Sequence, residues 1–286
     1  YPCVLKPLML SASRGVIRAN SAEEFAVAFA RIRRLLESPP IRAQQDCNSQ
    51  WIQIEGYIAG VECALEGWMA AGTLQRFALF DKPDPLQGPY FEESVYVTPS
   101  RLPTDCRALI WDMVEAAARA ARLGPGPIHA EIRLQRDLPG GDVAYVLEVA
   151  ARSIGGLCGR ALRFRAKGAQ DQAAIGLEEL LLRGALGQPL TSWELTAGAS
   201  GVMMIPIPHS GILDEVTGTE VAARLPGIDG LEITAKPDQP LEALPEGASY
   251  LGFIFARSAT PAAVEQALRA AYAKLDIRMR EALPVS

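Results

Sequence analysis

Two strand-like segments on either side of a turn constrain the fold of this chain more than any other feature. Residues 128–134 and 143–149 are rich in β-branched and aliphatic side chains, and the Asp-Leu-Pro-Gly-Gly-Asp stretch at 137–142 separates them. Gly, Pro and Asp between two such segments are typical of a β-hairpin. The pattern therefore predicts an antiparallel pair of strands.

Charged side chains gather on one face of this predicted hairpin. Side chains alternate along a strand, so His129 and Glu131 point to the same face of the first strand. Glu148, Ala150 and Arg152 share a face of the second strand if it extends that far. Burying charges among aliphatic neighbours costs free energy unless they are paired. Either a Mg²⁺ ion held by carboxylates and phosphates or a Glu–Arg salt bridge on a sheet face satisfies this requirement.

The remaining pattern predicts a mixed α+β chain. Ser21 and Glu24 form a capping box before a helix that ends at Leu36, ahead of Pro39 and Pro40. Thr104 is predicted to cap a helix that runs to Leu123 and stops at Gly124. Further strands are expected at 51–58, 61–69, 73–80, 201–207, 230–235 and 249–256, a loop at 84–103, and helices at 171–187 and after Thr260.

Composition narrows the class of protein. The net charge of −5 and the pI near 5.3 argue against a nucleic-acid partner held by phosphate contacts. No apolar run approaches the roughly 20 residues that cross a bilayer. The five cysteines are scattered without a Cys-x-x-Cys pair, which is typical of a reducing compartment. We therefore expect a globular, cytoplasmic protein.

Two further segments suggest nucleotide contacts. Lys6 precedes a small-residue loop, Ser11-Ala12-Ser13, whose backbone amides could approach phosphates; a surface hairpin with an exposed Lys fits the same residues. Glu55-Gly56-Tyr57-Ile58, followed by Glu62, could offer backbone groups and carboxylates to a nucleoside, or be ordinary polar residues at a strand end. Lys82 and Asp84, placed on the 84–103 loop or at its edge, could contact nucleotide or only water.

The order of these motifs is more informative than any one of them. Lys6-Pro7 with its small-residue loop, Glu55-x-Tyr-Ile, Gly60-x-Glu62, Phe91-x-Glu93, His129-x-Glu131 and Glu148-x-x-x-Arg152 before Gly155-Gly156 resemble the ATP-grasp superfamily. Within it, the chain resembles carboxylate–amine ligases of the L-amino-acid (dipeptide) ligase type. The resemblance implies an ATP-grasp domain over 1–196, with two α+β subdomains that grip ATP, and a small C-terminal α+β domain over 197–286.

The resemblance also implies roles for individual residues. Lys6, Ser11, Ala12 and Ser13 would contact ATP phosphates, Glu55, Gly56, Tyr57 and Ile58 would hold adenine, and Glu62 would bind ribose. Glu131 and Glu148 would ligate Mg²⁺, or Mn²⁺ in its place, and Arg152 would be the catalytic residue that stabilises transferred phosphoryl charge. Glu93, His129, Arg152, Gly155 and Gly156 would line the substrate pocket.

The implied reaction joins a small carboxylate, such as an amino acid, to an amine. We expect neither a nucleic acid nor a membrane as partner, and a homodimer is one candidate assembly. Ala150 stands where much of the superfamily has Asn, which removes one metal ligand. The family also has a domain and a first Lys upstream of the position of Tyr1, so we expect the chain to be an incomplete piece. Another ATP-grasp reaction, such as a carboxylase or a glycinamide-type synthetase, and a nucleotide-binding fragment without turnover are the alternatives.

Overall fold

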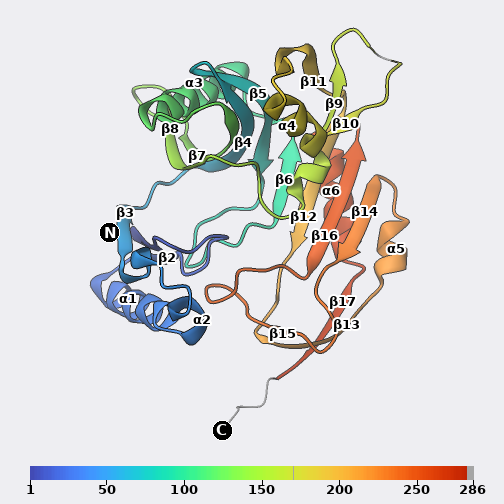
Figure 1. The fold of residues 1–286 in the computed structure, drawn as a ribbon. Coiled ribbons are helices and arrows are strands. Elements are labelled where there is room, and N and C mark those ends of the chain that lie inside the picture. The colour runs from blue at the N-terminus through green and yellow to red at the C-terminus, as the bar shows by residue number, and fades with distance from the viewer. Residues whose placement is uncertain (170, 282–286) are drawn as a thin grey trace.

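The chain forms a small lobe and a large lobe (Figure 1). A computed structural model describes residues 1–169 and 171–281. The small lobe holds a three-stranded antiparallel sheet in the order β2-β1-β3. Its strands are β1 (Cys3–Pro7), β2 (Ile17–Ala19) and β3 (Ile52–Gly56). The large lobe is built on an eight-stranded sheet.

Helix α1 (Ala22–Leu36) covers the small sheet. The Ser21 hydroxyl accepts a hydrogen bond from the Glu24 amide, as the capping box predicts. The Glu24 carboxylate, however, accepts from the Asn20 amide. Pro39 and Pro40 do not merely end a helix, because they open the short helix α2 (Pro39–Arg42). The apolar side of α1 packs with Leu5 and Ile17 into the core of this lobe.

The eight-stranded sheet has the order β14-β16-β12-β6-β5-β4-β7-β8. Its strands are β4 (Val61–Ala70), β5 (Thr73–Lys82), β6 (Val95–Thr98), β7 (Gly126–Gln135), β8 (Val143–Ala150), β12 (Ala199–Ile205), β14 (Ile228–Ile233) and β16 (Gly252–Ser258). Neighbouring strands are antiparallel throughout. The strands after residue 197 thus continue the same sheet as the strands before it. The domain boundary near this residue remains a prediction.

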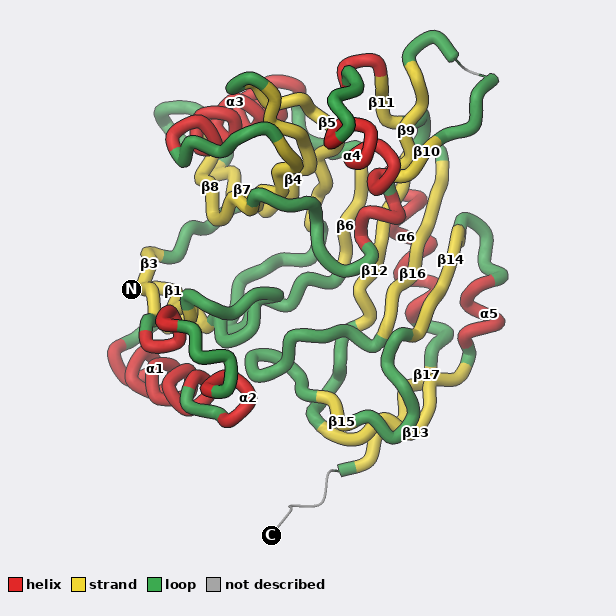
Figure 2. Tube along the Cα trace, in the orientation of Figure 1, coloured by secondary structure: helices red, strands yellow, loops and turns green. Residues whose placement is uncertain are grey.

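Helices cover both faces of this sheet (Figure 2). On one face, α3 (Thr104–Ala120) packs over β4, β5, β7 and β8, and α6 (Pro261–Tyr272) packs over β6, β12 and β16. On the other face lie α4 (Leu177–Ala185) and the small sheet of β9 (Arg163–Ala166), β10 (Ile175–Gly176) and β11 (Trp193–Leu195). The remaining strands, β13 (Gly211–Thr217), β15 (Pro240–Leu241) and β17 (Asp276–Arg280), form a separate three-stranded sheet. Helix α5 (Thr219–Ala223) follows β13 in the chain. None of the helices in the described ranges is long and apolar enough to span a bilayer.

Most predicted strands and the helix capped by Thr260 are confirmed, and some boundaries are wrong. The expected loop 84–103 contains β6, a fully buried strand between β5 and β12. Thr104 does not cap α3, because Pro103 occupies that position without a side-chain hydrogen bond. The helix ends at Ala120, and Arg122 takes the left-handed conformation expected of Gly124. The helix expected at 171–187 is the shorter α4, which lies after β10.

Candidate active site

Strand alternation places a row of charged side chains on one face of the large sheet. On β7, Ile128, Ala130 and Ile132 enter the core beneath α3, so His129, Glu131 and Arg133 face the opposite way. On β4, Glu62 and Glu66 share this charged face, and Lys82 adds to it from the end of β5. The predicted face of the β7–β8 hairpin is therefore confirmed, but it continues over β4 and β5, across four strands in all.

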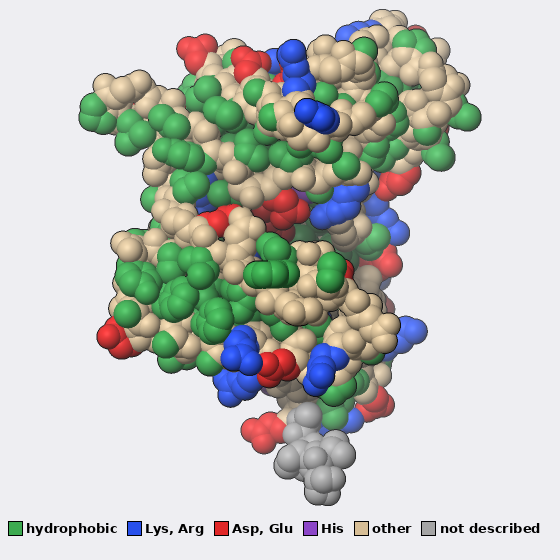
Figure 3. All heavy atoms as spheres, turned by 60° about the vertical axis from the view of Figure 1, so that its left-hand side comes forward, with side chains coloured by type: hydrophobic (Ala, Val, Ile, Leu, Met, Phe, Trp, Pro, Cys, Tyr) green, Lys and Arg blue, Asp and Glu red, His purple; other side chains and the backbone are tan. Residues whose placement is uncertain are grey.

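A cavity of about 840 Å³ lies between this charged face and the small lobe. Figure 3 shows it as a recess with acidic and basic side chains inside. All the candidate residues implied by the family resemblance line it: Lys6, Ser11, Ala12, Ser13, Glu55, Gly56, Tyr57, Ile58, Glu62, Glu93, His129, Glu131, Glu148, Arg152, Gly155 and Gly156. Residues that are far apart in sequence thus converge on one space, while their individual roles remain predictions.

The small lobe supplies the roof of the cavity. Lys6 on β1 forms an ion pair with Glu55 on β3, with Nζ 2.6 Å from Oε2. Both side chains are partly exposed to the cavity, so the Lys6 ammonium can exchange this partner for an anionic ligand. Ala12 and Ser13 have φ angles of 56° and 55°, which turn the loop after Lys6 back on itself. The expected phosphate loop is therefore a tight turn over the cavity.

Glu62 lies between two cations. Its Oε1 accepts a hydrogen bond from Lys82 at 2.8 Å, and its Oε2 accepts one from Arg133 Nε at 2.8 Å. The register explains this, because Glu62 is directly opposite Lys82 on one neighbouring strand and Arg133 on the other. A ribose hydroxyl would have to use the lone pairs that these two cations leave free.

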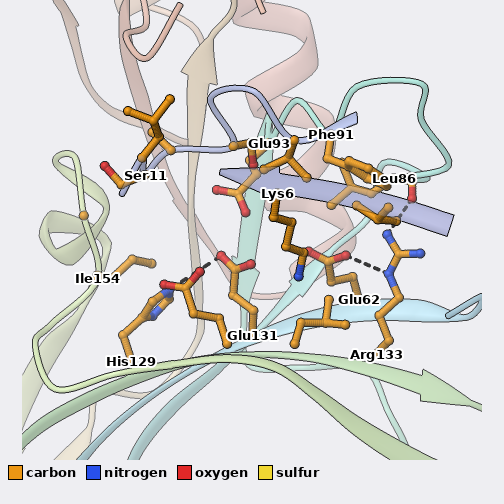
Figure 4. Close-up of a pocket in the computed structure, with 18 of the residues that line it drawn as sticks. Lys6, Ser11, Glu62, Leu86, Phe91, Glu93, His129, Glu131, Arg133 and Ile154 are labelled. Carbon is orange, nitrogen blue, oxygen red and sulfur yellow. Dashed lines mark hydrogen bonds and ion pairs between the residues drawn. The ribbon is translucent and has the colours of Figure 1, made fainter. Parts of the chain in front are cut away.

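Lys82 is a residue whose importance the sequence did not reveal. It closes β5 instead of lying on a loop, and it is buried. Its Nζ lies 2.5 Å from Glu93 and 3.3 Å from Glu131, in addition to its contact with Glu62. Burial would lower the pKa of Lys82, but the surrounding carboxylates outweigh that effect and raise it well above its usual range. The cation therefore fixes Glu62, Glu93 and Glu131 in place. Figure 4 labels these three carboxylates at the cavity.

Two of the three carboxyl groups that face Lys82, those of Glu93 and Glu131, are driven apart in acidity. Burial and the neighbouring Glu131 charge raise the pKa of Glu93 to about 7. Burial opposes ionisation of Glu131 as well, but the Lys82 ammonium and His129 hold its pKa well below the usual range. Near neutral pH, Glu131 is thus the ionised member, and Glu93 can exchange a proton.

His129 is held by a second buried carboxylate. Its Nδ1 lies 2.6 Å from Glu66 Oε1, and its Nε2 lies 3.8 Å from Glu131 Oε1. Burial would lower the pKa of His129, but Glu131 and Glu66 raise it to about 9. His129 therefore presents a cation to the cavity. Sequence reasoning missed Glu66, although its position four residues after Glu62, and so on the same strand face, was the available sign.

Glu148 and Arg152 occupy the open side of the cavity. Glu148 is directly opposite Glu131 in the β7–β8 pair, and a bulge follows this position. Its carboxylate is 58% exposed and lies 4.0 Å from Arg152. Carboxylate oxygens on adjacent strands are hard ligands of the kind that Mg²⁺ binds, so Glu131 and Glu148 fit this ion. The alternative Glu–Arg salt bridge is present but long and exposed, which makes it weak.

Another wall of the cavity comes from the loop that carries Gly155 and Gly156, between β8 and residue 158, and from the last third of the chain. Gly156 has a φ of 60°, and a Cβ at this position would meet the Phe253 ring at 3.2 Å. Met204 and Tyr250 line the same cavity, and no sequence pattern indicated this. Segments from both ends of the chain therefore enclose one site.

Comparison with known proteins agrees with this arrangement. Residues 1–161 match the family model of the ATP-grasp domain, and residues 203–280 match the L-amino acid ligase C-terminal domain 2. Alanine–anticapsin ligase of Bacillus subtilis is 29% identical over 167 residues, which are 54% of this chain and 34% of that relative. The chain thus spans about a third of the length of this curated relative.

Solved structures extend the likeness to nearly the whole chain. The L-amino acid ligase from Bacillus licheniformis superposes with a TM-score of 0.76 at 25% identity, covering 98% of this chain and 65% of that one. Phosphoribosylglycinamide synthetase from Anaerococcus prevotii, at 13% identity and a TM-score of 0.61, covers 98% and 65% and shares the fold. The family model covers more than half of the sequence, and its residues build the cavity: the chain belongs to the ATP-grasp family.

Proposed function

We propose that this protein is an ATP-dependent ligase that joins the carboxylate of an amino acid to an amine. One observation carries the proposal most strongly. The cavity is shared between residues that match the ATP-grasp domain and two residues, Met204 and Tyr250, of the segment that matches the L-amino acid ligase C-terminal domain. The carboxylase and glycinamide-type alternatives rest only on a shared fold.

ATP would lie beneath the small lobe. Lys6 and the Ser11–Ala12–Ser13 turn would contact its phosphates, since an ammonium and backbone amides are suited to anions. The Glu55–Ile58 linker would hold adenine through backbone groups, with Glu62 next to the ribose. In this pose the γ-phosphate would point toward Glu131, Glu148 and Arg152 at the open side.

The reaction that fits this site has two steps. An oxygen of the substrate carboxylate attacks the γ-phosphorus, the bond to the β-phosphate oxygen breaks, and ADP leaves with the electron pair. The amine then attacks the acyl carbon of the acyl phosphate, and inorganic phosphate leaves as an amide forms and the amine loses a proton. Arg152 would stabilise the charge on the transferred group. Mg²⁺, held by Glu131 and Glu148, would supply charge neutralisation at the phosphates.

The second half of the site would select the substrates. His129, as a cation, suits a substrate carboxylate, and Glu93 suits an amino group. Gly155 and Gly156 let the backbone approach the substrate closely, since no side chain projects from them into the cavity. The acidic and basic groups are thus arranged for a zwitterionic amino acid.

The test is mass spectrometry of reactions that contain the full-length protein, ATP, Mg²⁺ and a mixture of the common amino acids. We expect ADP, phosphate and an amide product in equal amounts. Arg152→Lys keeps the charge but loses the planar fork, so product should fall far more than ATP affinity. ATP binding without amide formation by the wild-type protein would refute the ligase assignment.

A further inference from the structure

Arg133 is a buried residue to which neither the motifs nor the family comparison assign a role. It lies on β7, two residues after Glu131, and is 3% exposed. Its guanidinium donates to three separate segments: Nε to Glu62 Oε2 at 2.8 Å, Nη1 to the Ile58 carbonyl at 2.8 Å, and Nη2 to the Leu86 carbonyl at 2.5 Å. Figure 4 shows it between Glu62 and Leu86.

Two aromatic rings reinforce these contacts. The guanidinium carbon of Arg133 lies 5.2 Å from the centre of the Tyr57 ring and 5.8 Å from that of Phe91. The two rings are 6.5 Å apart and nearly parallel, with 25° between their planes. Tyr57 belongs to the linker expected to hold adenine, and Phe91 belongs to the 83–94 loop between β5 and β6. Arg133 therefore contacts each of these segments through both a backbone carbonyl and a ring.

The large sheet holds the 83–94 loop through two cations of different kinds, while Arg18 and Arg31 of the small lobe hold it at Gln87, Pro89 and Tyr90. Lys82 holds Glu93 near its end, and Lys82 makes no hydrogen bond to the linker. Arg133 holds its beginning and middle, through Leu86 and Phe91, and also holds the linker. Among the described residues, Arg133 is the side chain that donates hydrogen bonds to both the linker and the loop. Arg18 also contacts both, with its guanidinium carbon 4.0 Å from the centre of the Tyr57 ring and a 2.7 Å hydrogen bond to the Gln87 carbonyl, but it makes no hydrogen bond to the linker. A lysine could not replace Arg133, because one ammonium cannot present a planar fork to three acceptors in different directions.

We propose that Arg133 is a positioning residue that couples nucleotide binding at the linker to ordering of the 83–94 loop, which carries Glu93. The inference rests on the proposed function, because it takes the 55–58 linker as the nucleotide contact. ATP that orders the linker would fix the Ile58 carbonyl and the Tyr57 ring. Arg133 then holds Leu86 and Phe91, so the substrate pocket at Glu93 takes its shape once ATP is present.

Hydrogen exchange followed by mass spectrometry tests this coupling with a non-hydrolysable ATP analogue, AMP-PNP, and Mg²⁺. In the wild-type protein we expect the nucleotide to slow exchange about tenfold both in the 11–16 loop and in 84–94. In Arg133→Lys, protection of 11–16 should persist while the nucleotide-dependent change in 84–94 falls to about twofold or less. A purely structural role would change exchange with and without nucleotide alike.

The matched control is Arg136→Lys, near the end of the same hairpin. Arg136 is partly exposed and lies 3.9 Å from Asp142, away from linker and loop, so this variant should behave as wild type. If Arg133→Lys does not fold, Phe91→Leu replaces it as the test variant, because this substitution removes the ring on the loop side and leaves Arg133 in place. It should lose the nucleotide-dependent protection of 84–94 alone.

The outcomes separate the coupling from the function beneath it. Equal nucleotide-dependent protection of 84–94 in the wild-type protein and in the test variant, Arg133→Lys or Phe91→Leu, overturns the coupling. Protection of 11–16 without any effect on 84–94 in the wild-type protein also overturns the coupling and leaves nucleotide binding intact. No nucleotide-dependent protection anywhere in the wild-type protein overturns the proposed function and the coupling together.

Discussion

Glu66 and His129 form a buried ion pair that fixes the charge on the floor of the cavity. They are directly opposite each other on β4 and β7, and Glu66 Oε1 lies 2.6 Å from His129 Nδ1. Their side chains are 1% and 5% exposed. Burial raises the pKa of Glu66, and both His129 and the Ile154 backbone oppose this rise. The pair therefore holds a proton on His129.

This pair should make stability depend on pH in the alkaline range. The pKa of His129 is raised to about 9, above the 6.5 of an unperturbed His. A raised pKa stabilises the fold fully below pH 6.5, and this contribution is lost as pH rises through 9. Urea unfolding of the wild-type protein should lose about 3 kcal/mol between about pH 6 and 10 relative to His129→Gln. Parallel pH curves for the two proteins would contradict this assignment.

Replacing Lys82 should destabilise the protein strongly and in a pH-dependent manner. Lys82→Met leaves Glu62, Glu93 and Glu131 buried without their shared cation, which should cost about 3–5 kcal/mol near pH 8. Near pH 5.5 the loss should be smaller, because Glu93, with a pKa already near 7, takes up a proton.

Thermal or urea unfolding at the two pH values measures the effect of Lys82→Met. Lys274→Met, at an exposed position, is the matched control and should change stability little. A loss that is independent of pH would show that packing, and not the carboxylate cluster, sets the cost.

Glu148→Ala separates the metal-site prediction from a structural role. The side chain is 58% exposed, so the free energy of unfolding should change by less than about 0.5 kcal/mol. If Glu148 binds Mg²⁺, the increase in nucleotide affinity that Mg²⁺ produces should fall by about tenfold or more, or about 1.4 kcal/mol. Calorimetry with and without Mg²⁺ gives both numbers. Glu220→Ala, an exposed Glu of α5, is the control, and an unchanged Mg²⁺ effect in Glu148→Ala would rule out this ligand.

Local alternation was enough to predict the hairpin and its charged face. The sequence around His129 and Glu131 alternates between apolar and charged residues, because one side of β7 enters a core and the other faces a cavity. The motif order brought the small-lobe residues to the same site, since the family fold supplies the long-range arrangement. The sequence thus predicted which residues lie at the site, but not which side chains they bind there.

Long-range pairing explains what was missed. Strand β6 (Val95–Thr98) has only four residues, and it pairs with β12, about a hundred residues later in the chain, so no local pattern distinguished it from the loop around it. The role of Lys82 depends on the register that sets it opposite Glu62. Arg133 appeared as one more charge on a strand until the structure placed the Ile58 and Leu86 carbonyls around it. These relationships exist only in three dimensions.

Glu246, in the loop before β16, should control how fast nucleotide leaves the cavity. Its carboxylate binds Arg31 of α1 with two hydrogen bonds, of 2.5 and 2.8 Å. In the same loop, the Glu246 carbonyl accepts from Arg14, and the Pro245 carbonyl accepts from the Gly15 amide at 2.7 Å. Arg14 and Gly15 directly follow the turn expected to cover the phosphates. The C-terminal part of the chain therefore holds the small lobe over the cavity.

Removing this charge pair should loosen the small lobe without unfolding it. Arg31 and Glu246 are both more than a third exposed, so Glu246→Gln should raise the nucleotide dissociation rate by only about two- to fivefold. Stopped-flow displacement of a fluorescent ATP analogue measures the rate, and the difference from wild type should shrink in high salt. Glu242→Gln, on the same loop, is the control, because its carboxylate lies 3.9 Å from Arg14 and is mostly exposed. An equal effect of both substitutions would mean that loop charge in general, and not the Arg31–Glu246 contact, sets the rate.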